Sequence, residues 1–343
     1  MQCKGVHMVT IDDVARKSGV SKGTVSNVFS KKRPISAEVT ERVINAAKEL
    51  NYVPNHIARS LAIKKTMIIG LKMPTLDFEL GSFDLKVING VVRKCTENGY
   101  RVLLDRNFEN ENSSLYSRDP VDGVILLNPK DNDPRIEQYQ NFNLPFVLIG
   151  SPSKDDDEIK FVDNNNTEIV KQVGEYLIEN GHQDILFLNA EKGMTVAEDR
   201  KVGLRQAFEN YNLPFVEESV VYNDIEKYTN ASDFGFYSLL EAYKNNNFTA
   251  VIADTDRVAL GVLRAARELG IEVPDDLSLI ALSNSETLAL ETTPKLTSIE
   301  LFPERLGEEA AEVLINVLTE QLAPKQKMIP AKLVIRDSCK NLN

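Results

Sequence analysis

Five residues between Lys22 and Asn27 have the types and spacing needed to read the edges of DNA bases. They are Lys22, Gly23, Thr24, Ser26 and Asn27. A lysine ammonium can donate to guanine, an asparagine amide can pair with adenine, and the Thr and Ser hydroxyls can reach bases or phosphates. Gly23 contributes no side chain, which predicts some degeneracy of recognition. The alternative interpretation is a solvated face of an ordinary surface helix.

Local signals predict three short helices that would position these residues. The capping residues are Thr10, Gly19, Ser21 and Ser36. Ser, Thr and Asp residues cap helix starts, and glycine accepts the left-handed conformation that ends a helix. Apolar residues at i, i+3 and i+4 spacing give each helix one buried side. Together they predict a three-helix, helix-turn-helix module whose second helix starts after Ser21.

The charge distribution separates the two interpretations. Residues 1–65 contain twelve Lys/Arg and five Asp/Glu, a net charge of +7, whereas the whole chain carries 40 and 51, a net charge of −11. The remaining residues therefore carry −18, and an acidic body cannot favour a polyanion. A small basic head on an acidic body is the pattern of a nucleic-acid-binding module. We expect steep salt dependence, with a log–log slope of about −0.9 per neutralised phosphate.

From residue 66 the sequence alternates between short apolar runs and helical patterns. We expect strands over 67–73, 100–105, 121–127, 145–150, 184–190, 219–223, 249–255 and 277–283. Helices are expected over 83–98, within 163–180, and over 198–210, 231–244 and 257–268. Continuous apolar runs between helices are typical of parallel strands covered on both faces. This number of strands and helices is too large for one compact sheet, so the sequence predicts two similar, doubly wound α/β halves.

Ligands of such sheets bind beyond the carboxyl ends of the strands, here in the cleft between the two halves. The residues that follow the expected strands are Lys72–Phe78, Asp105–Asn107, Asn128, Gly150–Ser151, Asp163–Asn164, Asn189–Glu191, Asp254–Asp256 and Ser283–Asn284. Many are Asp or Asn, which suit a polyhydroxylated ligand, although these residues also favour loops and helix caps in any α/β protein. Arg200 is a second candidate, with an exposed ion pair to Glu198 or Asp199 as the alternative.

Other classes of site find no support in the residue pattern. Cys3, Cys95 and Cys339 are scattered, and His7, His56 and His182 lack metal-ligand spacing, so neither a disulfide framework, a metal site nor a cofactor is expected. No nucleophile–base pair or phosphate-binding glycine loop suggests an enzyme. No run approaches the ~18 apolar residues of a membrane span, and the first residues lack a signal-peptide core. We expect a cytoplasmic protein.

Seven motifs in this order resemble the LacI/GalR (lac repressor) family of transcription regulators. They are VTIDDVARKSGVSKGTVSNVFS (9–30), LNYVPNHIARSLA (50–62), ENGYRVLL (97–104), VDGVIL (121–126), LIENGHQDILFL (177–188), ADTDRVALGVLRAARELGIEVPDDLSLIAL (253–282) and PKLTSIE (294–300). The resemblance implies a fold with a helix-turn-helix domain and two α/β subdomains of periplasmic-binding-protein type. It implies a repressor that binds a pseudo-palindromic operator as a homodimer. The expected domains are 8–54, a hinge and linker at 55–65, an N-subdomain at 66–162 plus 294–324, and a C-subdomain at 163–293 plus 325–338.

The resemblance also assigns residues to DNA. Residues 55–61 resemble a hinge helix that pairs with its partner in the minor groove, and Leu61 matches a leucine that wedges between base pairs, at a cost of a few kcal/mol. A buried contact of Leu61 with the body is the alternative. The expected DNA-binding residues are Thr10, Ser21, Lys22, Gly23, Thr24, Ser26, Asn27, Asn55, His56, Ala58, Arg59 and Leu61.

A small molecule in the cleft, most often a sugar in this family, is expected to control hinge order. The expected effector-binding residues are Pro74, Asp77, Phe78, Asp163, Arg200, Thr255, Asp256 and Ser283. The sequence departs from the family at Ser283-Asn284, where an Asp-Asp usually reaches a sugar hydroxyl, and in the short, polar segment 107–120. A nucleobase or a phosphocarrier protein as co-repressor, and a solute-binding protein from another class, remain alternatives. The tail after Arg336 is too short for a tetramer-forming coiled coil.

Overall fold

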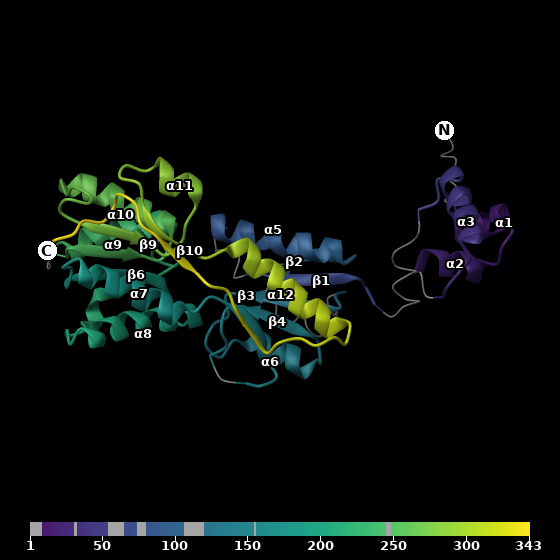
Figure 1. The fold of residues 1–343 in the computed structure, drawn as a ribbon, viewed down its shortest axis with the longest axis horizontal. Helices are drawn as coiled ribbons and strands as arrows, with labels where there is room; N and C mark the ends of the chain where they lie inside the picture. Colours follow the sequence, from purple (N-terminus) through teal and green to yellow (C-terminus); the bar gives the residue numbers. More distant parts are fainter. Residues whose placement is uncertain are drawn as a thin grey trace. The chain divides into compact units, whose positions relative to one another are not determined.

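The computed structural model describes residues 9–30, 33–53, 65–73, 80–105, 120–153, 156–244 and 248–343. The chain divides into two compact units, Met1–Met67 and Ile68–Asn343, each described here by itself (Figure 1). Within the described ranges, no helix has the length and apolar character needed to cross a membrane.

The described residues of the first unit form a three-helix module. These helices are α1 (Ile11–Ser18), α2 (Lys22–Ser30) and α3 (Ala37–Glu49), which confirms the three predicted helices. The N–H of Thr10 donates to the Asp13 carboxylate at 2.9 Å, and Gly19 ends α1 with φ +68°. The hydroxyl of Ser21 accepts from the N–H of Thr24 at 3.1 Å, as predicted for the cap of α2. The buried side chains of Val14, Ala15, Val25, Val43, Ala46 and Ala47 form the core of this module.

The second unit contains two six-stranded sheets. The first sheet has the order β11-β5-β4-β3-β1-β2, and all its pairings are parallel. Its strands are β1 (Ile68–Lys72), β2 (Arg101–Asp105), β3 (Gly123–Leu127), β4 (Phe146–Ile149), β5 (Lys160–Asp163) and β11 (Gln326–Met328). Helices α5 (Ser82–Glu97), α6 (Pro134–Asn141) and α12 (Pro303–Leu318) belong to this half (Figure 1).

The second sheet has the order β12-β10-β9-β8-β6-β7, with only β12 antiparallel among these pairings. Its strands are β6 (Ile185–Glu191), β7 (Val220–Asn223), β8 (Ala250–Ala253), β9 (Ser278–Ala281), β10 (Thr297–Glu300) and β12 (Lys332–Val334). The helices of this half are α7 (Asn166–Glu179), α8 (Thr195–Asn210), α9 (Ala231–Ala242), α10 (Asp256–Leu269) and α11 (Glu286–Glu291), with a 3₁₀ turn at Glu217–Ser219. The two predicted doubly wound halves are confirmed.

Alternate residues of the strands in the second sheet face opposite helix layers. Ile185 and Phe187 of β6 pack against α7 and α8, whereas Leu186 and Leu188 pack against α9 and α10. All four side chains are buried. A strand buried on both faces must be apolar at every position, which explains the continuous apolar runs in the sequence.

Paired helices approach closely through glycines. A Cβ on Gly261 of α10 would lie 2.0 Å from the carbonyl oxygen of Ser232, and one on Gly235 of α9 would lie 2.1 Å from that of Val258. Each glycine therefore faces the backbone of the other helix. Such contacts leave no room for a side chain, so α9 and α10 are held at one crossing point.

The chain passes between the halves three times, after β5, after β10 and between β11 and β12. The expected boundaries, with an N-subdomain of 66–162 plus 294–324, need correction at two places. β10 falls in the range expected for the N-subdomain but lies in the second sheet, and β11 falls in the range expected for the C-subdomain but lies in the first sheet. β11 is a three-residue strand with the polar sequence QKM, so no apolar pattern marks it. Helices α6 and α12 were also not predicted from the sequence.

Candidate functional site

The DNA-reading candidates lie at the start of α2. Ser21, Lys22 and Gly23 are exposed, as is Thr10 before α1, and Thr24, Ser26 and Asn27 are partly exposed. The structure therefore brings the described candidates to the surface of the three-helix module. Val25, between them, points into the core with no exposed surface.

Several of these polar side chains already have partners within the module. The ammonium of Lys22 forms an exposed ion pair with the carboxylate of Asp12 at 2.9 Å. The hydroxyls of Ser21 and Thr24 lie 2.9 Å apart, and Ser21 also caps α2. Ser21 thus has a structural role that is independent of any DNA contact. The exchange of the Lys22–Asp12 pair for a phosphate costs little, because exposed pairs contribute ~0–1 kcal/mol.

Some predicted residues lie outside the described ranges. They are the hinge residues Asn55, His56, Ala58, Arg59 and Leu61 and the cleft residues Pro74, Asp77 and Phe78. The segment 106–119 is likewise outside the described part of the chain.

Arg200 is buried in the second half. Only 7% of the residue is exposed, and its guanidinium forms an ion pair with the carboxylate of Asp254, at the end of β8. Its Nε also donates to the Asn166 amide oxygen at 3.3 Å. The alternative of an exposed pair with Glu198 or Asp199 is therefore wrong. Burial raises the pKa of Asp254, and the charge of Arg200 opposes this shift.

Asp163 ends β5 where the chain enters the second half. Its carboxylate accepts from the N–H of Ser151 at 3.0 Å and from the N–H of Asn164 at 2.8 Å. The hydroxyl of Ser151 donates to Asp199 of α8 at 2.8 Å, so this serine, which follows β4, connects the two halves. The pKa of Asp163 is raised to about 7, chiefly by burial and in part by the nearby charge of Asp199.

Thr255, Asp256 and Ser283 meet at the start of α10. The Thr255 hydroxyl accepts from the N–H of Val258 at 3.3 Å, and the Ser283 hydroxyl accepts from the N–H of Asp256 at 2.9 Å. The Asp256 carboxylate accepts from the N–H of Ser285 at 3.2 Å. Ser283 stands where the family usually has an aspartate, and its hydroxyl therefore helps to cap the start of α10. Burial raises the pKa of Asp256.

Asn284 belongs to a separate polar network that was not predicted from the sequence. Its amide nitrogen donates to Glu300 at 2.7 Å, and its amide oxygen accepts from Ser298 and Arg336, both at 2.9 Å. The network joins the residues after β9 to β10 and to the segment after β12. Arg336 was expected only to precede the tail. Its charge is the feature of the sequence that could have pointed to this network.

The two halves touch directly along one side of the cleft. The segment after β3 provides Lys130, whose ammonium lies 2.8 Å from the carboxylate of Glu191. Next to this pair, the N–H of Asp131 donates to the Gly193 carbonyl at 2.7 Å, and the Thr195 hydroxyl donates to the Pro129 carbonyl at 3.3 Å. Of these residues, only Glu191 was among the strand-end candidates.

The cleft is closed at the start of α10. Residues of α5, including Phe83 and Lys86, face Asp256 and Ser283 across a cavity of about 10 Å³. This volume is roughly the space needed by one water molecule. A sugar-sized molecule does not fit into this cavity.

Other strand-end candidates have structural roles. Lys72 forms a mostly buried ion pair with Asp105. The Asn189 amide donates to the Ala197 carbonyl at 2.8 Å and has no exposed surface. Within the described residues, no group of three His, Cys, Asp or Glu side chains could hold a metal ion.

A basic helix-turn-helix module and a two-lobed α/β unit with a polar cleft define a transcription regulator with a ligand-binding core. Residues 10–55 match the model of bacterial regulatory proteins of the lacI family, and residues 175–339 match that of a periplasmic binding protein-like domain. The chain belongs to the lacI family of transcription regulators, which confirms the resemblance seen in the sequence.

Similar proteins cover nearly the whole chain. The transcriptional regulator MalR of Staphylococcus xylosus is 31% identical over 96% of this chain and 98% of its own length. The transcriptional repressor PurR of Actinobacillus pleuropneumoniae is 30% identical over 98% and 100% of the two chains. A solved complex of the regulator CelR with cellobiose has a TM-score of 0.72 and 28% identity, and covers 96% of this chain and 99% of that one.

Proposed function

We propose that this lacI-family regulator represses transcription by binding a pseudo-palindromic operator as a homodimer, under the control of a sugar that binds in the cleft. The proposal rests on the presence of two parts in one chain. One is a basic module with its recognition residues at the surface, and the other is an acidic core with a polar, closed cleft. The proposed action is that of a binding protein in the cytoplasm, and no catalytic reaction is assigned to it.

The proposed DNA contacts begin with Lys22, Thr24, Ser26 and Asn27 in the major groove. A site selected from random double-stranded DNA with the full chain would provide the probe. Binding to this site is expected to weaken steeply with salt, with a slope of about −0.9 per neutralised phosphate. Lys22→Ala is expected to reduce the slope by about one if Lys22 contacts phosphate, and to relax base preference if it contacts guanine. A slope near zero would contradict the DNA-binding proposal.

The hinge proposal for Leu61 has a separate test. Leu61→Ala is expected to weaken binding to the selected site strongly and binding to unrelated DNA little, since a wedge acts only where a base step opens. Equal losses on both DNAs would contradict the wedge and would favour a contact with the body.

Exposed apolar side chains on a helix and an edge strand of the first half support the homodimer. On α5, Leu85 and Val92 are 53% and 42% exposed, and on the edge strand β2, Leu103 and Leu104 are 38% and 45% exposed. An edge strand with apolar side chains is prone to pair with another chain, so monomeric proteins usually cover it. Sedimentation of Leu85→Glu is expected to show monomer at concentrations where the wild type is dimeric.

The cleft favours a neutral, hydroxyl-rich ligand. Arg200 is already paired with Asp254, so its charge is not free to attract a phosphate, whereas Asp256 and Ser283 line the small cavity of the cleft. A carboxyl group and a hydroxyl suit the hydroxyls of a sugar. The relative CelR, solved with cellobiose, supports the sugar class.

A thermal-shift screen of the full chain against sugars, sugar phosphates and nucleobases tests this class. A ligand at ~100 times its dissociation constant stabilises by about 2.7 kcal/mol, which corresponds to a rise of roughly 5–10 °C in Tm. A shift with one sugar, lost in Asp256→Ala, is the expected result. A shift with a nucleobase alone would replace the sugar, and silence across the panel would favour a protein co-repressor.

A further inference from the structure

A concave surface on the outer side of the second half is separate from the cleft. It lies beside α9, holds a cavity of about 530 Å³, and shares no residue with the small cavity at Asp256 and Ser283. Its wall includes Tyr228 and Tyr237, and Leu269 at the end of α10 is 41% exposed there. Large exposed apolar side chains that gather in a concavity are typical of a binding site.

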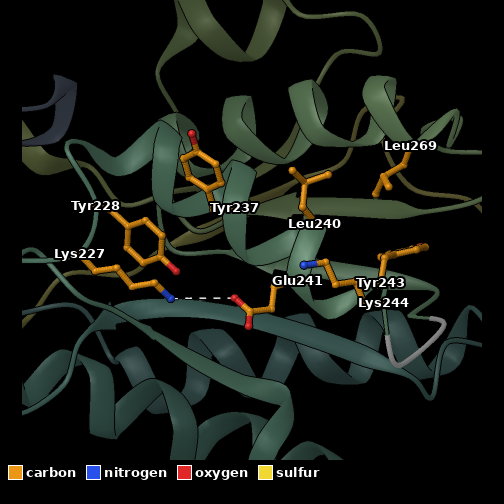
Figure 2. Close-up of a pocket in the computed structure, with 8 residues that line it drawn as sticks. All are labelled: Lys227, Tyr228, Tyr237, Leu240, Glu241, Tyr243, Lys244 and Leu269. Carbon is orange, nitrogen blue, oxygen red and sulfur yellow. Dashed lines mark ion pairs between the residues drawn. The ribbon is translucent and has the colours of Figure 1, made fainter.

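The two tyrosine rings form an aromatic platform. Their centroids are 6.5 Å apart and their planes differ by only 18°. Figure 2 shows the rings beside one another with their faces turned toward the same side. Tyr237 is 53% exposed, so part of its ring is open to a ligand. Flat apolar surfaces of this kind stack against other rings.

The platform is fixed before any ligand arrives. The Tyr228 ring packs against the buried Phe234 ring with centroids 5.4 Å apart, and the N–H of Tyr228 donates to the Asp224 carbonyl at 3.0 Å. At the far end of the cavity, the Tyr243 hydroxyl donates to the Phe248 carbonyl at 2.8 Å. A preformed site loses little conformational entropy when it binds a ligand.

The rim of the cavity carries more positive than negative side chains. The ammonium of Lys227 lies 4.0 Å from the Glu241 carboxylate, and Figure 2 shows Glu241 between the ammonium groups of Lys227 and Lys244. The nearby Asp224 carboxylate accepts the N–H groups of Glu226 and Lys227, at 3.1 and 3.3 Å, and so serves the turn. Two lysines and one glutamate give the rim a net positive charge, although residues 66–343 together carry a net charge of −18.

We infer that this cavity, the aromatic groove, is a second small-molecule site that binds a flat ring carrying one anionic group. The ring stacks on Tyr228 and Tyr237, and the anion takes the place of Glu241 beside one of the two lysines. The site is independent of the sugar site proposed in the cleft, because the two share no residue.

Ligand-observed NMR titration of the full chain with indole-3-acetate tests this inference, with indole-3-acetamide as the uncharged probe. For a ligand of about 13 non-hydrogen atoms, we expect a Kd on the order of 1 mM. Tyr237→Ala is expected to weaken both probes roughly tenfold, through loss of stacking. Lys244→Gln is expected to weaken the acetate about threefold and to leave the amide unchanged.

Two variants serve as controls. Tyr211→Ala removes another partly exposed tyrosine outside the groove, and Ser283→Ala alters the cleft. Both are expected to bind the probes as the wild type does. Non-saturable binding of indole-3-acetate to the wild type, unchanged binding by Tyr237→Ala, or loss of binding in Ser283→Ala would each overturn the inference.

Discussion

Arg200 and Asp254, which are 54 residues apart in the chain, form an ion pair within the second half. The arginine comes from the start of α8 and the aspartate from the end of β8, and both side chains are largely removed from solvent. The pair neutralises the cation that the family resemblance assigns to the effector.

Removal of Arg200 alone is expected to destabilise the core by about 3–5 kcal/mol, because Asp254 would remain buried without its partner. Replacement of both residues, as Arg200→Met with Asp254→Leu, is expected to recover most of this loss, since apolar residues need no partner. Urea unfolding at neutral pH measures both variants. Losses that simply add in the double variant would contradict the pairing.

Asp163 predicts a dependence of stability on pH. Its pKa is raised from 3.8 to about 7 by burial, so the folded protein holds a proton that the unfolded chain has lost. The contribution of Asp163 to stability is therefore complete below about pH 4, falls as the pH rises toward 7, and is lost above it. The effect is on the order of 4 kcal/mol. Burial also raises the pKa values of Asp84, Asp199, Asp254 and Asp256, which act in the same direction.

Asp163→Asn should flatten this dependence, since the amide cannot ionise. Chemical unfolding between pH 5 and pH 8 measures the slope, and the exposed Asp131→Asn serves as the control that keeps it. An unchanged slope in Asp163→Asn would show that this carboxyl ionises normally.

Loss of the Ser283 hydroxyl is expected to lower the free energy of unfolding by a small amount. Ser283→Ala removes the acceptor of the Asp256 N–H, and loss of a cap costs typically about 1 kcal/mol. Thr287→Ala, on the exposed side of α11, is the matched control and should stay within about 0.5 kcal/mol of the wild type. If the two variants unfold at the same urea concentration, Ser283 does not stabilise α10.

Substitution by alanine is expected to have opposite effects on stability at two glycines. Gly261→Ala places a methyl group 2.0 Å from the Ser232 carbonyl oxygen, where the backbone must shift, and is expected to cost about 3 kcal/mol. Gly23→Ala meets only the Ser21 hydroxyl at 3.7 Å and should stabilise α2 by roughly 0.5–1 kcal/mol. Thermal unfolding followed separately in the head and the core distinguishes them. A tolerated Gly261→Ala would show that α9 and α10 can move apart.

Local and long-range features differ in how far the sequence predicted them. Ser21 and Gly19 act through neighbours within a few positions, so their capping roles could be predicted from spacing alone. The apolar run at 184–190 predicted β6 because burial on both faces demands it. The partner of Arg200 could not be predicted, because tertiary folding alone brings Asp254 beside it. α12 was missed although its buried residues have helical spacing, and β11 lacks any apolar signal.

The order of segments along the chain has a consequence for synthesis. The three-helix module is complete once α3 has emerged, whereas β11 and β12, near the end of the chain, each supply one edge of a different sheet. Domains fold as units as they leave the ribosome, N-terminal first. A nascent chain therefore presents a folded DNA-reading head before either lobe that would regulate it is finished. Ribosomes stalled near residue 320 would hold a head without a working control unit.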